Sequence, residues 1–249
     1  MQVISVRDFH KTYEKTVAVR GLSFDVEPGH ILGLVGPNGA GKTTTMRAIA
    51  GILPPTHGRL LIAGNDVVET PVAAKRELAY VPDDPHLFDA LSVWEHLEFI
   101  ASAYEVADLE TAGAALLEQF ELTEKRDAFA HGLSRGMRQK LAIACAYLHN
   151  PRAILLDEPL TGLDPRGIRI MRESIKQRAA AGAAILVSSH LMSLVEGLCT
   201  HVLILSSGNQ LFFGTIAEAR SAYEELGGEA SLEDVFFHAT EGTRTQTEA

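Results

Sequence analysis

The sequence Gly36-Pro37-Asn38-Gly39-Ala40-Gly41-Lys42-Thr43 lies between an apolar run and a stretch with helical periodicity. It fits the pattern of a glycine, four residues, a second glycine, lysine and then serine or threonine. The glycines permit a tight turn whose backbone N–H groups point inward, and the following helix presents its positive end to the same point. The stretch therefore predicts a phosphate-binding loop with a nucleoside triphosphate as its ligand.

Two side chains at the end of this loop have separate expected roles. Lys42 can reach the outer phosphates as a point charge, and the Thr43 hydroxyl can bind the Mg²⁺ that accompanies them. An apolar run at His30–Val35 predicts a buried strand before the loop, and Lys42–Ala50 predicts a helix after it. This context disfavours the alternative, an ordinary glycine-rich turn.

Length, composition and charge limit the classes of protein to which this chain can belong. The chain has 249 residues, 46% of them hydrophobic, and a formal net charge of −10. The length suits one or two domains with a sizeable core, and the acidic balance disfavours a nucleic-acid partner. No apolar run reaches the ~18 residues of a membrane span, and Arg7 and Asp8 interrupt any signal-peptide core, so we expect a cytosolic chain. Cys145 and Cys199 lie in apolar surroundings and are expected to be buried thiols.

The N-terminal part alternates between apolar and polar residues with a period near two. This alternation predicts two strands, Met1–Phe9 and Val17–Val26, in an antiparallel sheet at the edge of the fold. Tyr13 lies in the predicted loop between them, where its ring can stack on a nucleobase or serve only in packing. After the first helix, a strand is predicted at Arg59–Ala63 and a helix at Thr70–Leu78.

An acidic loop follows a short predicted strand at Ala79–Val81. It reads Pro82-Asp83-Asp84-Pro85, and its two prolines exclude regular structure. The loop can approach a metal ion or water, or it can be a solvated connector.

The segment Ser92–His149 carries helical patterns and no strand pattern. Ser92 forms a capping box with Glu95, and further helices are predicted to begin at Asp108 and Ser134. The segment therefore predicts a helical lobe inserted into an α/β fold.

Two carboxylates follow the next apolar run, Ala153–Leu156. Asp157 and Glu158 would lie at the carboxyl edge of a parallel sheet, where such sheets bind ligands. There Asp157 can support Mg²⁺, and Glu158 can act as the base that orients a water toward the terminal phosphorus. Two adjacent acids also occur in solvated turns, which is the alternative here.

A histidine is expected at the same edge. A helix predicted at Pro165–Ala181 leads to a buried strand at Ala184–Val187, which ends at Ser188-Ser189-His190. His190 can donate a hydrogen bond to the terminal phosphate, or it can be a structural histidine.

Five motifs, taken together, resemble those of an ABC-type ATPase in order and spacing. They are GPNGAGKT at Gly36, LSRGMRQ at Leu133, LLDEP at Leu155, LTGLD at Leu160 and the SSH that ends in His190. The resemblance covers nearly the whole chain. It implies a P-loop NTPase fold of the α/β class, in which helices flank a RecA-like core sheet beside an antiparallel β subdomain and an inserted α-helical subdomain.

The resemblance also implies domain limits. The ATPase domain would span residues 1–240, with its core at 1–84 and 150–215 and its helical subdomain at 85–149. A C-terminal helical extension would occupy 216–240, and a disordered tail 241–249.

The same resemblance implies roles for single residues. Tyr13 resembles the aromatic that stacks on adenine, Asp157 the Walker B carboxylate, and Glu158 the general base. Asp164 would be the D-loop residue and His190 the switch histidine, which acts in catalysis with Glu158 and Lys42. The ATP-binding Walker A loop would comprise Gly36, Pro37, Asn38, Gly39, Ala40, Gly41, Lys42, Thr43 and Thr44.

LSRGM implies a second copy of the chain. In the family this segment caps ATP bound to the other subunit, and Ser134 as an N-cap with Gly136 in the first turn suits that task. Because the chain has one copy of each motif, two chains would close head to tail around two ATP molecules, as a homodimer or with a similar subunit.

Two positions depart from the family pattern. Arg135 stands where many members have glycine, and Asp83 stands where glutamine is usual. A carboxylate at Asp83 could still meet Mg²⁺, and it would add negative charge beside the phosphates. These departures, with the sequence Ser231–Phe236, resemble the exporter branch of single-domain ABC ATPases.

The expected function is therefore the ATP-hydrolysing motor of a membrane exporter. The chain would be cytoplasmic and peripheral at the inner face of the cell membrane, held by an integral membrane permease that contacts Pro85, Leu87 and Phe88. A soluble mechanical ATPase that acts on DNA, ribosomes or metal-cluster assembly is the alternative. The sequence has no heptad insertion, basic arm or cysteine cluster to favour it. A binding module without hydrolysis is disfavoured by the intact Lys42 and Glu158.

Overall fold

A computed structural model describes residues 2–222 and 231–241, which form two sheets flanked by helices. The larger sheet has the strand order β10-β9-β3-β8-β7-β6. Its strands from β9 to β6 are parallel, and β10 is antiparallel to β9. Its strands are β3 (Ile31–Val35), β6 (Leu78–Val81), β7 (Ala153–Asp157), β8 (Ala184–Ser188), β9 (His201–Ser206) and β10 (Asn209–Thr215).

The smaller sheet is antiparallel, with the order β2-β1-β4-β5. Its strands are β1 (Ile4–Tyr13), β2 (Thr16–Val26), β4 (His57–Ile62) and β5 (Asn65–Asp66). Strand β1 continues past the predicted end at Phe9, so Tyr13 is its last residue and does not lie in a loop. The register shifts between Val6 and Phe9, where Asp8 has a φ of 45°, and this irregularity interrupts the alternation that sequence patterns detect.

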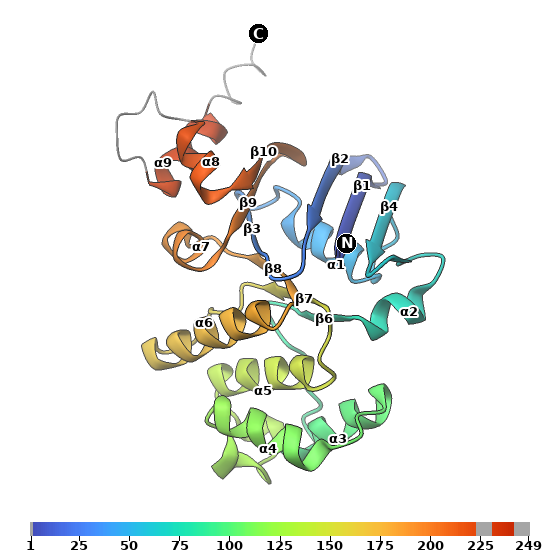
Figure 1. Cartoon of the computed structure of the whole chain (residues 1–249), viewed down its shortest axis with the longest axis vertical. Coiled ribbons are helices and arrows are strands. Elements are labelled where there is room, and N and C mark those ends of the chain that lie inside the picture. The colour runs from blue at the N-terminus through green and yellow to red at the C-terminus, as the bar shows by residue number, and fades with distance from the viewer. Residues whose placement is uncertain (1, 223–230, 242–249) are drawn as a thin grey trace.

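The helices are distributed around both sheets (Figure 1). They are α1 (Lys42–Ile49), α2 (Pro71–Arg76), α3 (Val93–Tyr104), α4 (Leu109–Gln119), α5 (Arg135–Leu148), α6 (Pro165–Ala180), α7 (Met192–Leu198), α8 (Ile216–Ser221) and α9 (Leu232–Glu241). Helix α2 is shorter than predicted, because Leu78 pairs with Ala153 as the first residue of β6. The predicted tail lies outside the described residues except for Glu241, which ends α9.

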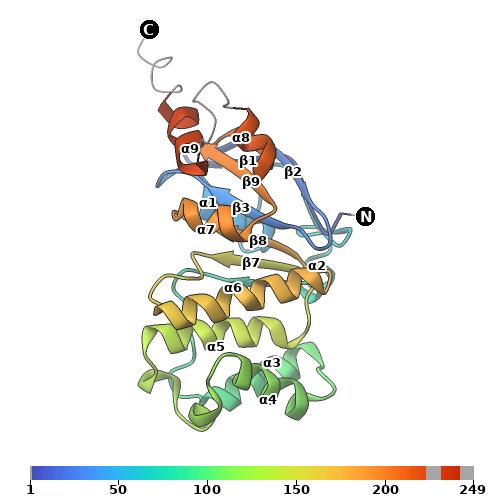
Figure 2. The same ribbon diagram turned by 60° about the vertical axis from the view of Figure 1, so that its left-hand side comes forward.

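Helices α3, α4 and α5 form the lobe that the sequence predicts between β6 and β7. Figure 2 shows α5 packed under α6 and the other two helices farther from the sheet. The predicted caps are present: Glu95 N donates to the Ser92 hydroxyl at 3.2 Å, and Ser92 N donates to Glu95 at 2.6 Å. The α/β fold with an antiparallel sheet and an inserted helical lobe is therefore confirmed.

The central strands of the larger sheet, β3, β8 and β7, are buried on both faces. Every residue of β3, β7 and β8 is buried, which explains their uninterrupted apolar runs. In β7, Ile154 and Leu156 belong to the core beneath the helical lobe, whereas Leu155 belongs to the core shared with α1 and the smaller sheet. Since side chains alternate along a strand, Asp157 follows Leu155 onto the face that carries α1.

Candidate functional site

The glycine-rich loop joins β3 to α1, and its backbone conformation depends on glycine. Gly41, directly before α1, has a φ of 104°, which disfavours a residue with a side chain. A Cβ atom at Gly41 would also lie 2.8 Å from the carbonyl oxygen of Ala18 in β2. The loop is therefore packed directly against the smaller sheet, and α1 begins at the loop's end.

Lys42 folds back over this loop. Its Nζ donates to the carbonyl oxygens of Gly36 at 2.7 Å and Pro37 at 3.2 Å. Burial lowers the pKa of Lys42, and the negative charges of Glu158 and Asp157 oppose that shift. The ammonium group is thus held over the loop and faces two carboxylates.

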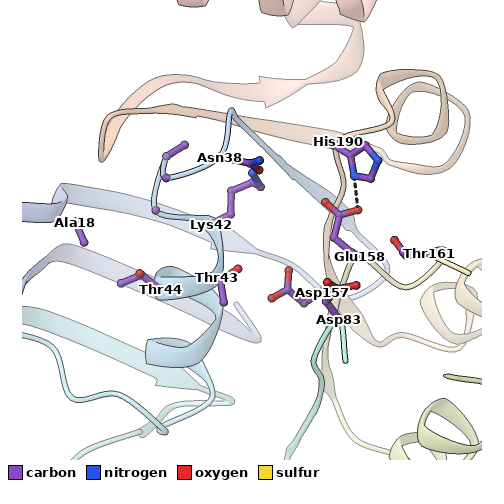
Figure 3. A pocket seen from close by; sticks show the side chains of 13 residues that line it. Ala18, Asn38, Lys42, Thr43, Thr44, Asp83, Asp157, Glu158, Thr161 and His190 are labelled. Carbon is purple, nitrogen blue, oxygen red and sulfur yellow. Dashed lines mark hydrogen bonds and ion pairs between the residues drawn. The ribbon is translucent and has the colours of Figure 1, made fainter. Parts of the chain in front are cut away.

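A pocket of about 540 Å³ opens between the loop and the carboxyl edge of the larger sheet. Figure 3 shows the loop side chains on one wall and the acidic side chains on the other. We call this the phosphate-loop pocket; its lining residues are Ala18, Asn38, Gly39, Ala40, Gly41, Lys42, Thr43, Thr44, Asp83, Asp157, Glu158, Thr161 and His190.

Asp157 and Glu158 share one hydroxyl group from the neighbouring strand. The Ser188 Oγ donates to Asp157 Oδ1 at 2.5 Å and accepts from Glu158 N at 3.0 Å. Ser188 is the register partner of Asp157 in the parallel pair β7–β8. Ser188 belongs to the SSH motif, which alone predicts no role for it; its register position opposite Asp157 identifies the role.

Glu158 adopts a backbone conformation that is rare for a residue with a side chain. Its φ is 48°, in the left-handed region, and such strain is typical of functional sites. Its Oε2 lies 2.9 Å from Nδ1 of His190, as the dashed line in Figure 3 shows. His190 is 64% exposed at its side chain and Glu158 only 18%, so the histidine covers the carboxylate from the solvent side.

The structure brings most of the predicted site residues together in this pocket. Ala18 and Thr161 also line it, although no sequence pattern predicted a site role for either residue. Asp83 lines it as well, and its Oδ1 lies 3.8 Å from Nη2 of Arg135. Asp164 lies outside the pocket and caps α6 through Gly167 N at 2.9 Å.

Several predicted residues do not line the pocket. Gly36 and Pro37 contribute through the carbonyl groups that hold Lys42. Tyr13 is 43% exposed at the end of β1, with the ammonium of Lys11 over its ring at 5.2 Å. Ser134 caps α5 by accepting from Met137 N at 3.3 Å, and neither it nor Gly136 belongs to the pocket wall. The chain therefore does not fold its own LSRGM segment onto its own phosphate loop.

Comparisons with known proteins agree with this geometry. Residues 19–161 match the family model described as ABC transporter. The chain is 35% identical to the ABC-type transporter ATP-binding protein EcsA of Bacillus subtilis over 243 residues, which cover 96% of this chain and 97% of that protein. It is 34% identical to the Nod factor export ATP-binding protein I of Cupriavidus metallidurans, over 85% of this chain and 71% of that protein.

A solved structure shows the same fold. It is described as the structure of an ATP-binding subunit of an ABC transporter, and it superposes with a TM-score of 0.90 at 33% identity. The superposition covers 95% of this chain and 99% of that one. The chain therefore belongs to the ABC transporter family, as an ATP-binding protein that hydrolyses ATP.

Proposed function

We propose that the chain is the motor subunit of a membrane exporter and works as a head-to-tail dimer that closes around two ATP molecules. The observation that carries the proposal is the position of LSRGM. Ser134 and Gly136 start a helix of the lobe and are absent from the wall of their own phosphate-loop pocket. A second copy would supply them, so that ATP binding closes the dimer and hydrolysis reopens it.

The start of α5 has the features of an anion-binding helix end. Ser134 is exposed, and because its oxygen accepts from Met137 N, its hydroxyl hydrogen stays available to donate. Gly136 packs closely on the neighbouring loop, since a Cβ atom there would lie 3.2 Å from the carbonyl oxygen of Gly162. The N-terminus of a 14-residue helix favours negative charge, so this surface suits the terminal phosphate held by the other chain.

Within each pocket the side chains have complementary tasks. The loop backbone from Gly36 to Thr44, with Lys42, would hold the phosphates, and Tyr13, outside the pocket at the end of β1, would stack on the adenine. Glu158 would orient the attacking water and accept its proton at Oε1 or Oε2. His190 would hold Glu158 in place, because its Nδ1 faces that carboxylate at 2.9 Å. Its other ring nitrogen, Nε2, would form the hydrogen bond to the terminal phosphate.

The donor set of the pocket fits Mg²⁺. Thr43 and Asp157 present oxygen atoms, with Asp83 as a further carboxylate on the same wall. The described residues contain no group of three or more His, Cys, Asp or Glu that could hold a metal without a ligand's help. Mg²⁺ characteristically takes one or two carboxylates and completes its shell with phosphates and water. When bound, it would neutralise charge on the outer phosphates.

A second cavity offers a docking surface for the membrane partner. We call it the lobe groove; it has a volume of about 420 Å³ and is mostly apolar. Its lining residues are Ile52, Leu78, Ala79, Tyr80, Val81, Pro82, Pro85, His86, Leu87, Ile100, Tyr104, Ala142, Cys145, Ala146 and His149. Phe88 and Phe99 are the sequence neighbours of the lining residues Leu87 and Ile100; their rings lie 5.4 Å apart, and the two residues are 55% and 52% exposed.

Such a groove suits an amphipathic helix of an integral membrane permease. None of the helices within residues 2–222 and 231–241 is long and apolar enough to cross a membrane. Docking at the groove would place the chain on the cytoplasmic side, at the inner face of the cell membrane. The name of the Cupriavidus relative, a Nod factor export ATP-binding protein, supports the exporter direction.

The dimer is tested with Glu158→Gln, which keeps the shape of the side chain and removes the base. We expect ATP binding to persist, turnover to fall about 10²-fold or more, and an ATP-bound dimer to accumulate in light scattering. Glu124→Gln, a change of the same kind on the surface of the lobe, is the control. Unchanged hydrolysis would remove Glu158 from its role, and a monomer in saturating ATP would contradict the dimer.

A further inference from the structure

Two residues that depart from the family pattern face each other in the fold. Arg135 Nη2, at the start of α5, lies 3.8 Å from Asp83 Oδ1, in the loop after β6. The stem of Arg135 also lies against Gly162, since a Cβ atom there would lie 2.9 Å from its Cδ. Gly162 follows Thr161, which lines the phosphate-loop pocket. Arg135 therefore connects two segments of the pocket wall.

The charges that line the pocket indicate what the contact between Arg135 and Asp83 does. Three carboxylates line the wall, those of Asp83, Asp157 and Glu158. Among the described lining residues, Lys42 alone has a permanent positive charge. A triphosphate entering the pocket thus meets more negative than positive charge, and repulsion between like charges weakens its binding.

The three carboxylates differ in how they are compensated. Asp157 receives the Ser188 hydroxyl, and Glu158 faces His190. Asp83 is 52% exposed at its side chain and pairs with the guanidinium of Arg135, which is 63% exposed. Without that guanidinium, the Asp83 carboxylate would face the phosphates uncompensated.

We propose that Arg135 is a positioning residue for the ATP site of its own chain. Its guanidinium neutralises Asp83 and draws the carboxylate toward α5, so that the pocket can accept a polyphosphate although Asp83 replaces an uncharged residue. Exposed ion pairs are worth little in water, so removing the pair should weaken nucleotide binding by about two- to fivefold. The proposal concerns one chain's own site and does not depend on the dimer or the permease.

The test is a double-mutant cycle on the intact chain, read as the dissociation constant of fluorescent mant-ADP in EDTA. EDTA removes any contribution of Asp83 to Mg²⁺ binding, and ADP binding to one chain does not require a second copy. We expect Arg135→Gln to weaken binding about two- to fivefold and Arg135→Lys to restore most of it. In an Asp83→Asn background, Arg135→Gln should change the constant by less than about 1.5-fold, because no charge is left to neutralise.

A matched control is Arg76→Gln, which breaks another exposed ion pair, with Glu105 at 3.3 Å, away from the pocket wall. It should leave mant-ADP binding unchanged. Equal weakening by Arg135→Gln with and without Asp83 would place Arg135 against the nucleotide itself and overturn the proposal. An unchanged dissociation constant for mant-ADP in Arg135→Gln would also overturn the proposal. Thermal denaturation of each variant identifies any loss that comes from unfolding, and Arg135→Lys then decides the outcome.

Discussion

Replacing Ser188 with alanine should destabilise the protein more than any ordinary serine substitution in its core. Ser188 has no exposed surface, and its hydroxyl donates to the buried carboxylate of Asp157 at 2.5 Å. Alanine fills nearly the same volume, so packing stays intact and the loss reports the hydrogen bond. Hydrogen bonds to charged groups contribute about 1.5–3 kcal/mol, whereas those between neutral groups contribute about 0.5–1.5 kcal/mol.

The second hydrogen bond of Ser188 adds little to this figure. Glu158 N donates to the Ser188 hydroxyl at 3.0 Å, but it also lies 3.3 Å from the Ser188 carbonyl oxygen, which the substitution retains. We therefore expect the free energy of unfolding to fall by about 1.5–3 kcal/mol, measured by urea denaturation of the nucleotide-free chain.

Ser174→Ala is the matched control for this measurement. Ser174 is equally buried, but its hydroxyl donates to a neutral group, the Met171 carbonyl oxygen, at 2.8 Å. Its loss should cost about 0.5–1.5 kcal/mol at most. Equal losses in the two variants would refute the argument that Ser188 supports a buried charge at the end of β7.

Three further predictions concern the loop, the groove and a buried histidine. Lys42→Ala should weaken nucleotide binding about 10- to 100-fold in calorimetry, because a charged contact is lost; unchanged affinity would contradict the phosphate-loop assignment. Phe88→Asp, next to the lining residue Leu87, should spare the ATPase activity of the isolated chain and reduce copurification with a membrane subunit. Phe129→Asp changes a ring that is 51% exposed and has no lining residue as a sequence neighbour, so it should not reduce copurification. Burial lowers the pKa of His149 in the folded chain. Below about pH 6.5 the histidine of the unfolded chain is therefore protonated more readily than that of the folded chain. The free energy of unfolding should fall as the pH drops through this range. His149→Phe, which keeps a ring stacked on Tyr104, should make the fall in unfolding free energy shallower, and an identical slope would exclude His149 as its source.

Local patterns were enough to predict the elements that carry the phosphate loop. The buried strands β3, β7 and β8 appear as unbroken apolar runs, since both of their faces are covered. Helix α1 begins at Lys42 as predicted, because the glycine before it has a conformation that few other residues adopt.

Elements that depend on distant pairing were missed or misplaced. Residues His10 to Tyr13 are polar or exposed and belong to β1 only through pairing with other strands: His10 pairs with β4, and Lys11 to Tyr13 pair with β2. Strands β9 and β10 were not predicted individually, although they extend the larger sheet beyond β3. The hydrogen bonds of the Ser188 hydroxyl to the Asp157 carboxylate and to Glu158 N, and the contact between Asp83 and Arg135, also follow from tertiary pairing that a single sequence does not display.

The loop after β6 belongs to both cavities at once. Asp83 lines the phosphate-loop pocket, and two positions further on Pro85 lines the lobe groove. A ligand in one cavity that shifts this loop alters the free energy of binding in the other cavity. The coupling is reciprocal, so each ligand changes the affinity for the other by the same factor. A compound that fills the groove should therefore change ATP affinity without touching the nucleotide. A compound that lowered ATP affinity in this way would inhibit the ATPase from a site outside the nucleotide pocket.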